Sequence, residues 1–309
     1  MQIIRNLNQA NIPPLVLTIG NFDGVHLGHL EIINKVKKIA KEKNIASAIL
    51  TFEPHPISFF KSDRPKDFRI NSLAQKLKIF QDLDIDFVIT LPFNQDLADI
   101  TAPNFIEEIL AKSLNTKHLV VGYDFIFGKN RQGNFEFLEK EAPFELSRIS
   151  AKVSILEKSE QICSSSLIRK LINSGEVFEA RKFLTRNFSI QGIVTNGRKL
   201  ANQLGFPTVN LTIKPHIIKP KFGVYKTQIT IPSLDKTFPS ITNFGIKPTI
   251  EAGLAPLYET HILNFNQDIY EKKVSVEFID FIRDEKKFAS IEELKEQIRL
   301  DVDSIFKSS

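Results

Sequence analysis

The chain has 309 residues, of which 42% are hydrophobic and 25% are charged, a composition typical of a soluble globular protein with a sizeable core. This length predicts two domains. The net charge of +5 is spread evenly, with 25 basic against 22 acidic residues up to residue 186 and 16 against 14 beyond it. Nucleic-acid-binding surfaces gather basic residues on one stripe, so this pattern argues against a nucleic-acid partner.

Cysteine usage and hydropathy indicate where the protein works. Cys163 is the only cysteine, so the chain cannot form an internal disulfide, and we expect a reducing compartment. The first residues contain no apolar segment of signal-peptide length, and no apolar run approaches the ~18 residues of a membrane span. We therefore expect a cytoplasmic protein without a membrane partner, and the sequence is compatible with a weak homo-oligomer.

The first 183 residues alternate short apolar runs with helical patterns. The apolar runs predict strands at 15–19, 45–52, 87–91 and 118–121. Helical patterns lie at 29–43, 72–83 and 104–114. Ser72 and Gln75 stand in capping-box spacing at the start of the second of these. The alternation predicts a Rossmann-like domain over residues 1–183, in which helices cover a parallel sheet and ligands bind at the carboxyl ends of the strands.

From about residue 188 the pattern changes to short strands separated by turns that contain Gly and Pro. We expect six strands, at 188–195, 208–213, 223–231, 237–243, 257–265 and 274–283. One helix closes the chain, with Ser290 and Glu293 in capping-box spacing. Residues 184–309 are thus predicted to form a six-stranded antiparallel β-barrel with a closing C-terminal helix.

The sequence GNFDGVHLGH, residues 20–29, lies where the first predicted strand turns into the first predicted helix. Free N–H groups and the helix dipole at such a turn favour an anion, and glycines let the backbone approach a phosphate. His26 and His29 fall on one side of the first helical turn, where they could stabilise charge on a phosphoryl group. Alternatively, each could be a capping or surface residue, or the two could bind zinc with Asp23, although no third strong ligand stands at a recognisable spacing.

GYDFIFGKN, residues 122–130, looks like a P-loop but has five residues between its glycines instead of four. It also has Asn130 where a magnesium-binding hydroxyl should stand, so we reject that interpretation. Its aromatic side chains, with Asp124 between them, suit a planar ring ligand at a strand end. The alternative is that Phe125 and Phe127 are simply core residues.

SSSLIR, residues 164–169, places three serines at a helix start with Arg169 one turn further on. Ser164 could act as an ordinary N-cap. Hydroxyls and a guanidinium at a helix N-terminus also make a phosphate clamp. The sequence leaves both interpretations open.

The densest motif of the second half is GRKLANQLGFPTVNL, residues 197–211. Two glycines bracket a basic loop, and Thr208 and Asn210 begin the next predicted strand. Alternation sends these two side chains to one face, where a hydroxyl and a carboxamide oxygen could hold Mg²⁺ against a nucleotide. An ordinary loop that enters a strand is an equally good explanation.

Glu259 lies within a predicted strand, on one face with His261 and Leu263, so we expect it to be partly buried. A strand-borne carboxylate near a magnesium–nucleotide site could accept a proton from an attacking alcohol. The alternative is an ion pair at the rim of the barrel.

GNFDGVHLGH, TFEPHP (51–56), GYDFIFG and SSSLIR together resemble the ordered motifs of the FAD synthetase module of bacterial bifunctional riboflavin kinase/FAD synthetases. The resemblance implies a nucleotidyltransferase domain in which the phosphate of FMN attacks the α-phosphorus of ATP, giving FAD and pyrophosphate. It implies catalytic roles for His26 and His29 and flavin contacts from Asp124, Phe125 and Phe127. The implied ATP-binding residues are Gly20, Asn21, Phe22, Asp23, Gly24, His26, Gly28, His29, Ser164, Ser165, Ser166 and Arg169.

GRKLANQLGFPTVNL, NFGIKPT (243–249), YETHILNFNQDIY (258–270) and VEFIDFIRDEKKF (276–288) resemble the riboflavin kinase module of the same family. The resemblance implies that Glu259 is the general base on the riboflavin 5′-hydroxyl and that Thr208 and Asn210 hold Mg²⁺ and ATP. Further ATP contacts are implied at Gly197, Lys199, Gly205 and Pro207. Flavin contacts are implied at Asn243, Glu259 and Arg283. Ala201 and Asn202 depart from the Gly and Arg that are common in this loop.

The resulting hypothesis is one chain that makes FMN and then FAD, with Mg²⁺ as cofactor, ATP as substrate, and riboflavin, FMN and FAD as substrates or products. One alternative is an adenylyltransferase with a weakened kinase. Another is a pantetheine-phosphate adenylyltransferase, against which the barrel half argues because that family lacks it. The third is a non-catalytic flavin- or nucleotide-binding protein.

Overall fold

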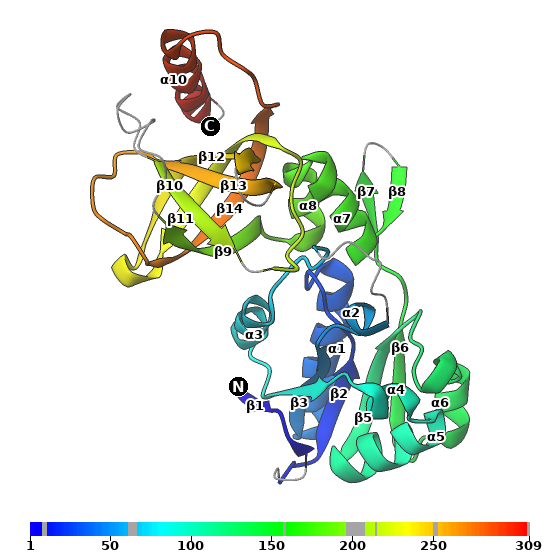
Figure 1. Ribbon diagram of the computed structural model, residues 1–309. Helices are drawn as coiled ribbons and strands as arrows, with labels where there is room; N and C mark the ends of the chain where they lie inside the picture. Colours follow the sequence, from blue (N-terminus) through cyan, green and yellow to red (C-terminus); the bar gives the residue numbers. More distant parts are fainter. Residues whose placement is uncertain are drawn as a thin grey trace. The chain divides into compact units, whose positions relative to one another are not determined.

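The computed structural model describes residues 1–7, 11–60, 67–156, 159–195, 208–213, 215–249 and 253–307 (Figure 1). Contacts divide the chain into two compact units. The first comprises Met1–Lys66 with Asn71–Ser165, and the second comprises Asp67–Ile70 with Ser166–Ser309. The functional boundary between residues 183 and 184 stays a prediction.

The first unit is built on a six-stranded sheet of order β1-β4-β3-β2-β5-β6, in which every neighbouring pair is parallel. The strands are β1 (Gln2–Ile4), β2 (Leu15–Ile19), β3 (Ala46–Glu53), β4 (Phe87–Pro92), β5 (Thr116–Gly122) and β6 (Glu145–Ile149). The strand order reverses at β2, which lies between β3 and β5. Such a switch point opens a ligand crevice at the carboxyl ends of the strands.

Helices pack on both faces of this sheet, which explains why its central strands are almost continuously apolar. Alternate residues of β2 show the division, since Leu15 and Leu17 pack with Phe105 and Leu110 on one face while Val16 packs with Val36 on the other. The helical elements are α1 (Leu27–Lys43), α2 (Pro56–Phe60), α3 (Leu73–Asp82), α4 (Gln95–Asp99), α5 (Ala102–Asn104), the π-helix η2 (Phe105–Ser113), the 3₁₀ turn η3 (Lys129–Arg131) and α6 (Phe135–Glu141).

Several local predictions for this unit can be compared with the structure. The capping box before α3 is present, with Ser72 N–H donating to Gln75 Oε1 at 2.9 Å and Gln75 N–H donating to Ser72 Oγ at 3.3 Å. The helix expected over 104–114 is largely a π-helix. Four strands were not predicted, namely β1, β6 and the two strands of an antiparallel hairpin, β7 (Val153–Leu156) and β8 (Ser159–Ile162).

The second unit contains a closed antiparallel barrel of order β10-β13-β12-β11-β14-β9, and the predicted fold class is confirmed. Its strands are β9 (Phe188–Thr195), β10 (Thr208–Ile213), β11 (Gly223–Ile231), β12 (Lys236–Thr249), β13 (Gly253–Ile262) and β14 (Lys273–Arg283). The helical elements that the contacts group with it are α7 (Ser165–Ser174), α8 (Val177–Leu184), the 3₁₀ turn η4 (Pro232–Leu234) and α10 (Ile291–Lys307).

The bore of the barrel is filled by side chains, so it is a core and not a channel. Aromatic rings stack there, with Phe244 and Tyr258 4.3 Å apart between ring centroids. A chain of buried hydroxyls joins three strands, from Thr227 to Thr242 at 3.0 Å and from Thr242 to Thr260 at 3.0 Å. Because the bore is filled, ligands must bind outside the barrel or at its rim. Helix α10 packs on the outer wall through Ile305.

Candidate functional site

The loop that joins β2 to α1 carries the GNFDGVHLGH motif at the switch point of the sheet. Its backbone takes left-handed conformations at Phe22, Gly24 and Val25, with φ of 48°, 88° and 40°. Two of these three residues are not glycine, so the loop stores strain that its surroundings must hold. Phe22 and Val25 supply that anchor by burying their side chains in the apolar core.

Phe22 was predicted among the ATP-binding residues, and this binding stays a prediction. The residue is 2% exposed, and its ring lies edge-on to Phe80 with centroids 5.8 Å apart. The residue acts as the apolar anchor of the loop.

Polar contacts hold the rest of the loop. The ammonium group of Lys76 donates to the Asn21 carbonyl at 2.9 Å, and Ser165 Oγ donates to the Asp23 carbonyl at 2.8 Å. The Asn71 N–H donates to Asp23 Oδ1 at 3.3 Å. Ser165 was predicted to bind phosphate, but here its hydroxyl proton fixes the loop.

Lys76 was missed by the sequence analysis, although it is only 4% exposed. The sequence did contain a signal for its burial, because Lys76 lies on the apolar face of α3 that Leu73, Leu77 and Phe80 form. A cation on such a stripe must find a polar partner or be expelled, since burying an unpaired charge is costly. Its partner is the backbone of the predicted phosphate loop.

His26 and His29 form a reciprocal capping box at the start of α1, in which the ring of each accepts the backbone N–H of the other. The bond from His26 N–H to His29 Nδ1 is 3.3 Å long. The two rings stack with centroids 3.7 Å apart and planes 22° from parallel. A ring nitrogen that accepts an N–H carries no proton, so a neutral His29 ring holds its proton on Nε2, the nitrogen farther from the backbone.

Gly28 lies between the two histidines, where a side chain would be tightly packed. A Cβ at this position would come 3.3 Å from the His26 ring and 3.5 Å from the Cys163 carbonyl oxygen. The ring of His26 would have to give way. The glycine therefore allows the close packing of the capping box.

The register of the sheet brings three motifs together. Strand β2 pairs with β3 on one side and with β5 on the other. The segments TFEPHP and GYDFIFG include the carboxyl ends of β3 and β5, so both flank the loop after β2 at the same edge of the sheet. In the first of them, His55 is buried and its Nδ1 accepts the Ile57 N–H at 3.1 Å, which starts α2.

The predicted flavin contacts in GYDFIFG differ in burial. Asp124 is exposed and Phe125 is half-buried, whereas Phe127 is 8% exposed and belongs to the apolar core. The rings of Phe125 and Phe127 stack with centroids 5.4 Å apart. Phe127 thus packs in the core and against Phe125, and the flavin contacts of Asp124, Phe125 and Phe127 stay predictions.

An aromatic cluster that the sequence analysis missed lies at the ends of β3 and β4. It contains Phe52, Phe59, Phe60 and Phe93, and the ring of Phe93 lies 5.4 to 5.8 Å from each of the other three. Phe60 is 63% exposed, which is unusual for a large apolar side chain in such a cluster. The available signal was the pair Phe59 and Phe60, which follows TFEPHP after two residues.

Ser166 and Arg169 belong to the second unit. Ser166 is exposed, and Arg169 Nε donates to the Phe68 carbonyl at 2.8 Å while its guanidinium lies 5.7 Å from the centre of the Phe68 ring. Ser164, half-buried, precedes α7. Their binding of phosphate stays a prediction.

The barrel brings three predicted kinase residues side by side. In the strand register Asn210 lies opposite Glu259, and Glu259 lies opposite Asn243. Directly paired residues of antiparallel strands point to the same face, so the three side chains share one patch. Because Leu211 and Tyr258 fill the bore, this patch is on the outside of the barrel.

Asn210 and Glu259 differ from ordinary residues of an outer wall. Within the described part of the chain, the buried Oδ1 atom of Asn210 has no hydrogen-bond partner. Glu259 is half-buried, as expected. Thr208 lies two residues before Asn210 on the same face, opposite His261. The other predicted ATP contacts, Gly197, Lys199, Gly205 and Pro207, and the departures Ala201 and Asn202 lie outside the described residues.

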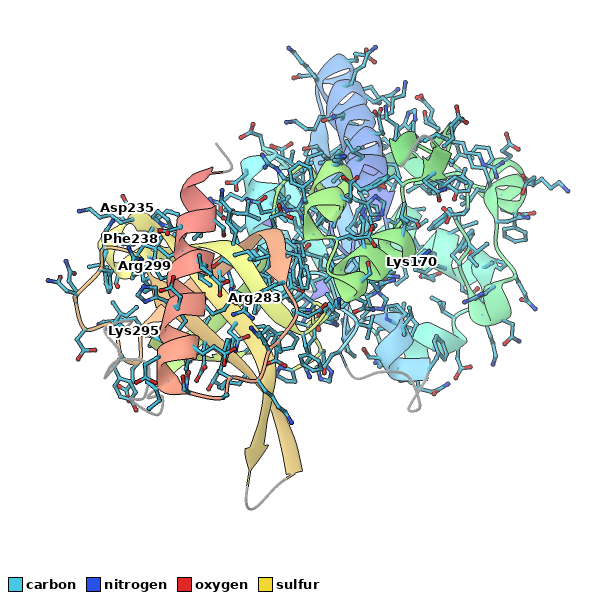
Figure 2. The ribbon with its side chains drawn as sticks, turned by 90° about the horizontal axis from the view of Figure 1, so that it is seen from above. Lys170, Asp235, Phe238, Arg283, Lys295 and Arg299 are labelled. Atoms are coloured by element: carbon cyan, nitrogen blue, oxygen red, sulfur yellow. The ribbon has the colours of Figure 1, made fainter. Side chains whose placement is uncertain are left out.

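Arg283, a predicted flavin contact, is engaged within the protein. Its Nε and Nη2 donate to the two carboxylate oxygens of Asp301 at 2.9 and 2.8 Å, and Asp301 is 4% exposed. The pair joins β14 to α10, and Figure 2 shows Arg283 beside that helix. A bidentate bond to a buried carboxylate thus engages Nε and Nη2, and the flavin contact of Arg283 stays a prediction.

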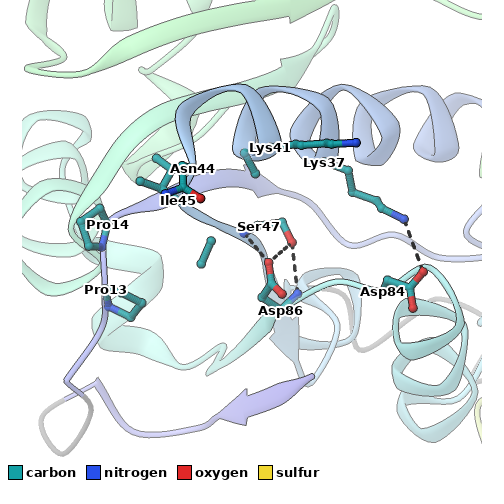
Figure 3. Close-up of a pocket in the computed structure, with 11 residues that line it drawn as sticks. Pro13, Pro14, Lys37, Lys41, Asn44, Ile45, Ser47, Asp84 and Asp86 are labelled. Atoms are coloured by element: carbon teal, nitrogen blue, oxygen red, sulfur yellow. Dashed lines mark hydrogen bonds and ion pairs between the residues drawn. The ribbon is translucent and has the colours of Figure 1, made fainter.

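A pocket lies at the opposite, amino-terminal edge of the parallel sheet (Figure 3). Its floor includes Asp86, whose carboxylate accepts from the Ser47 N–H and hydroxyl at 2.9 and 2.7 Å. Lys37 approaches Asp84 at 3.8 Å at its rim. None of the predicted site residues lines this pocket, so the loops at the carboxyl ends remain the candidate site.

Two global properties complete the description of the site. The described ranges contain no group of three His, Cys, Asp or Glu side chains that could hold a metal ion. None of the helices described here is long and apolar enough to cross a membrane. There are thus two candidate sites, each within one unit: the glycine-rich loop at the switch point of the parallel sheet, and the polar patch with one carboxylate on the barrel.

Comparisons with known proteins agree with this division. The FAD synthetase family matches residues 8–166, and the riboflavin kinase family matches residues 184–308. Bifunctional riboflavin kinase/FMN adenylyltransferases from Buchnera aphidicola and from Escherichia coli K12 are 38% and 35% identical to the chain. The alignments cover 98% and 96% of this chain and 96% and 94% of those proteins.

A crystal structure described as a macrolide-efflux protein from Streptococcus pneumoniae superposes with a TM-score of 0.90 at 28% identity, covering 100% of this chain and 99% of that one. The chain belongs to the family of bifunctional riboflavin kinase/FMN adenylyltransferases. It is a transferase with a nucleotidyltransferase half followed by a kinase half, in the order that the motifs predicted.

Proposed function

We propose that the chain performs two consecutive reactions. The barrel unit transfers the γ-phosphoryl group of ATP to the 5′-hydroxyl of riboflavin, giving FMN and ADP. The first unit then transfers the adenylyl group of a second ATP to FMN, giving FAD and pyrophosphate. The observation that carries the proposal is the cross-strand row Asn210–Glu259–Asn243 on the very half of the chain that matches the riboflavin kinase family.

In the kinase reaction, the riboflavin hydroxyl oxygen attacks the γ-phosphorus of ATP while Glu259 accepts the hydroxyl proton. A carboxylate held on a strand suits this work, because the base must stay within hydrogen-bond reach of one hydroxyl. Asn243, which lies opposite Glu259 in the register, donates to the flavin in this proposal. The remainder of catalysis in phosphoryl transfer is positioning and charge stabilisation.

Thr208 and Asn210 are the residues that would hold Mg²⁺. The fit rests on the buried Asn210 Oδ1, for which the described residues offer no hydrogen-bond partner, and on the hydroxyl of Thr208 on the same face. Neutral oxygen donors of this kind match a hard cation that also keeps water and phosphate ligands. When bound, the ion neutralises charge on the phosphates of ATP.

In the adenylyl transfer, no general base is required, because the attacking group is already an anionic phosphate oxygen of FMN. The Nε2–H groups of His26 and His29 donate to the phosphate oxygens of ATP, and the N–H groups at the start of α1 add to the same field. The exposed ring of Phe60 and the half-buried ring of Phe125 offer faces on which the flavin can stack.

The test is chromatography of flavins after incubation of the purified chain with riboflavin, ATP and Mg²⁺, beside a reaction started from FMN. FMN followed by FAD in the first reaction, and FAD in the second, would support both steps. FAD only from supplied FMN would remove the kinase step. A stoichiometric bound flavin without any product would overturn the proposal in favour of a binding protein.

A further inference from the structure

The one thiol of the chain touches a histidine of the phosphate loop. Cys163 Sγ lies 3.5 Å from His26 Nδ1, and each of the two side chains is only 6% exposed. The backbone fixes the cysteine in place, because its N–H donates to the Lys152 carbonyl at 2.8 Å. The contact is therefore a built feature of the site, made between segments 137 residues apart in the sequence.

The direction of this hydrogen bond follows from the other bonds of the sulfur. The backbone N–H groups of Gly28 and Leu27 donate to Cys163 Sγ, so the sulfur already accepts two hydrogen bonds. The proton of a neutral thiol is then left for His26 Nδ1, 3.5 Å away, and the thiol acts as the donor.

The environment keeps that proton on the sulfur. Burial raises the pKa of the Cys163 thiol, and this effect outweighs the N–H groups of Gly28 and Leu27, which would favour the thiolate. At neutral pH the side chain is thus a thiol that can donate. A reactive thiolate would show the opposite balance.

We propose that Cys163 is a positioning residue for adenylyl transfer: its S–H donates to His26 Nδ1 and so holds the His26 ring in the tautomer and orientation that present Nε2–H to the phosphates of ATP. The inference rests on the proposed function of the first unit. It assigns a role to a residue that the sequence analysis used only as an indicator of compartment.

The competing explanation is that Cys163 merely fills space beside the ring. The two explanations differ in what valine should do, since valine has a similar size and shape but no proton to donate. Packing alone predicts that Cys163→Val is harmless and that the polar, smaller serine is worse. A donor role predicts the reverse order.

The experiment compares Cys163→Val and Cys163→Ser with the unaltered full chain. Thr116→Val is the matched control, because Thr116 is also buried and its Oγ1 has no hydrogen-bond partner among the described residues. Three quantities are measured for each: kcat and KM for FAD formation from FMN, the rate of riboflavin phosphorylation, and the protonation of the His26 ring nitrogens by two-bond ¹H–¹⁵N NMR correlation. His26→Gln assigns the His26 signals in the spectrum.

We expect Cys163→Val to lower kcat for FAD formation about 5- to 10-fold with KM for FMN nearly unchanged, the size typical of one lost hydrogen bond. Its His26 signals should show a mixture of tautomers, whereas Cys163→Ser should retain most of the activity and a bare Nδ1. Thr116→Val and riboflavin phosphorylation should not change.

Equal activity of Cys163→Val and the unaltered chain, or a His26 Nδ1 that carries a proton in the unaltered chain, would overturn the inference. Absence of FAD formation by the unaltered chain would instead refute the proposed function on which it rests. A loss of activity together with a lowered melting temperature in both cysteine variants, with the His26 tautomer unchanged, would mark the residue as structural and also overturn the inference.

Discussion

Replacement of Asp301 by Ala should destabilise the packing of α10 on the barrel more than most single substitutions would. The Asp301 side chain is 5% exposed, and its carboxylate accepts four hydrogen bonds, three from Arg283 and one from Gln297 at 3.0 Å. Removal of one partner of a buried ion pair leaves the other charge uncompensated, which costs about 3–5 kcal/mol. The Arg283 side chain is 21% exposed, so water recovers part of this cost, and we expect about 3 kcal/mol.

The assay is hydrogen exchange of the α10 amides at fixed pH. A loss of about 3 kcal/mol in local stability speeds exchange roughly 100-fold, since each 1.4 kcal/mol is tenfold. Lys78→Ala is the control, because Lys78 and Asp82 form an exposed pair that is expected to contribute little. The double variant Arg283→Met, Asp301→Leu should exchange more slowly than Asp301→Ala, as an apolar pair leaves no charge unpaired. A change below about threefold in Asp301→Ala would refute the reasoning.

Three further predictions concern the first unit. Lys76→Met should lower the rate of FAD formation about tenfold, because the Asn21 carbonyl loses its 2.9 Å hydrogen bond. Lys78→Met, at an exposed neighbouring lysine, should leave that rate unchanged. Equal rates of FAD formation for the two variants would contradict this. Burial lowers the pKa of His118, whose ring bonds Glu145 and Ser147. The neutral ring therefore stabilises the fold above the unfolded pKa of about 6.5, and this stabilisation is lost as the pH falls through the folded pKa. Melting temperatures from pH 7.5 to 5 should therefore fall more steeply for the unaltered chain than for His118→Asn. At pH 7 iodoacetamide should alkylate Cys163 more slowly than it alkylates free cysteine, because burial raises the pKa of the thiol. Alkylation of Cys163, followed by mass spectrometry, should become faster when the pH is raised above about 9. A rate at pH 7 equal to that of free cysteine would contradict the burial argument.

The parts of the fold that follow from local periodicity could be predicted from the sequence. Strands β9, β10 and β11 have the predicted bounds, because alternation of buried and exposed residues along a barrel wall is a local signal. Strand β1 is three residues long, and β6, with the sequence ELSRI, lies at a sheet edge where polar side chains are tolerated. Neither presents an apolar run, so both were missed.

The site was predictable where motif order implied topology, and not where it depended on tertiary contacts. The loop after β2 follows from a strand–glycine–helix pattern. The outward turn of Asn210 and Glu259 follows from alternation, but their direct pairing requires the barrel register. The inward turn of Phe22 and the contact of Lys76 with the loop depend on residues far apart in the sequence. The apolar stripe of α3 indicates that Lys76 is buried, but it does not reveal the partner of Lys76.

The central claim is that two sites on one chain catalyse successive steps, and variants that each inactivate one of the two sites test it most directly. Chromatography should follow FMN and FAD for Glu259→Gln and for His29→Ala, each started once from riboflavin and once from FMN. We expect Glu259→Gln to lose riboflavin phosphorylation by about 100-fold or more while converting supplied FMN to FAD at the normal rate. His29→Ala should form FMN normally and FAD at least ~10-fold more slowly. A variant that loses both steps equally while its melting temperature stays unchanged would contradict the account.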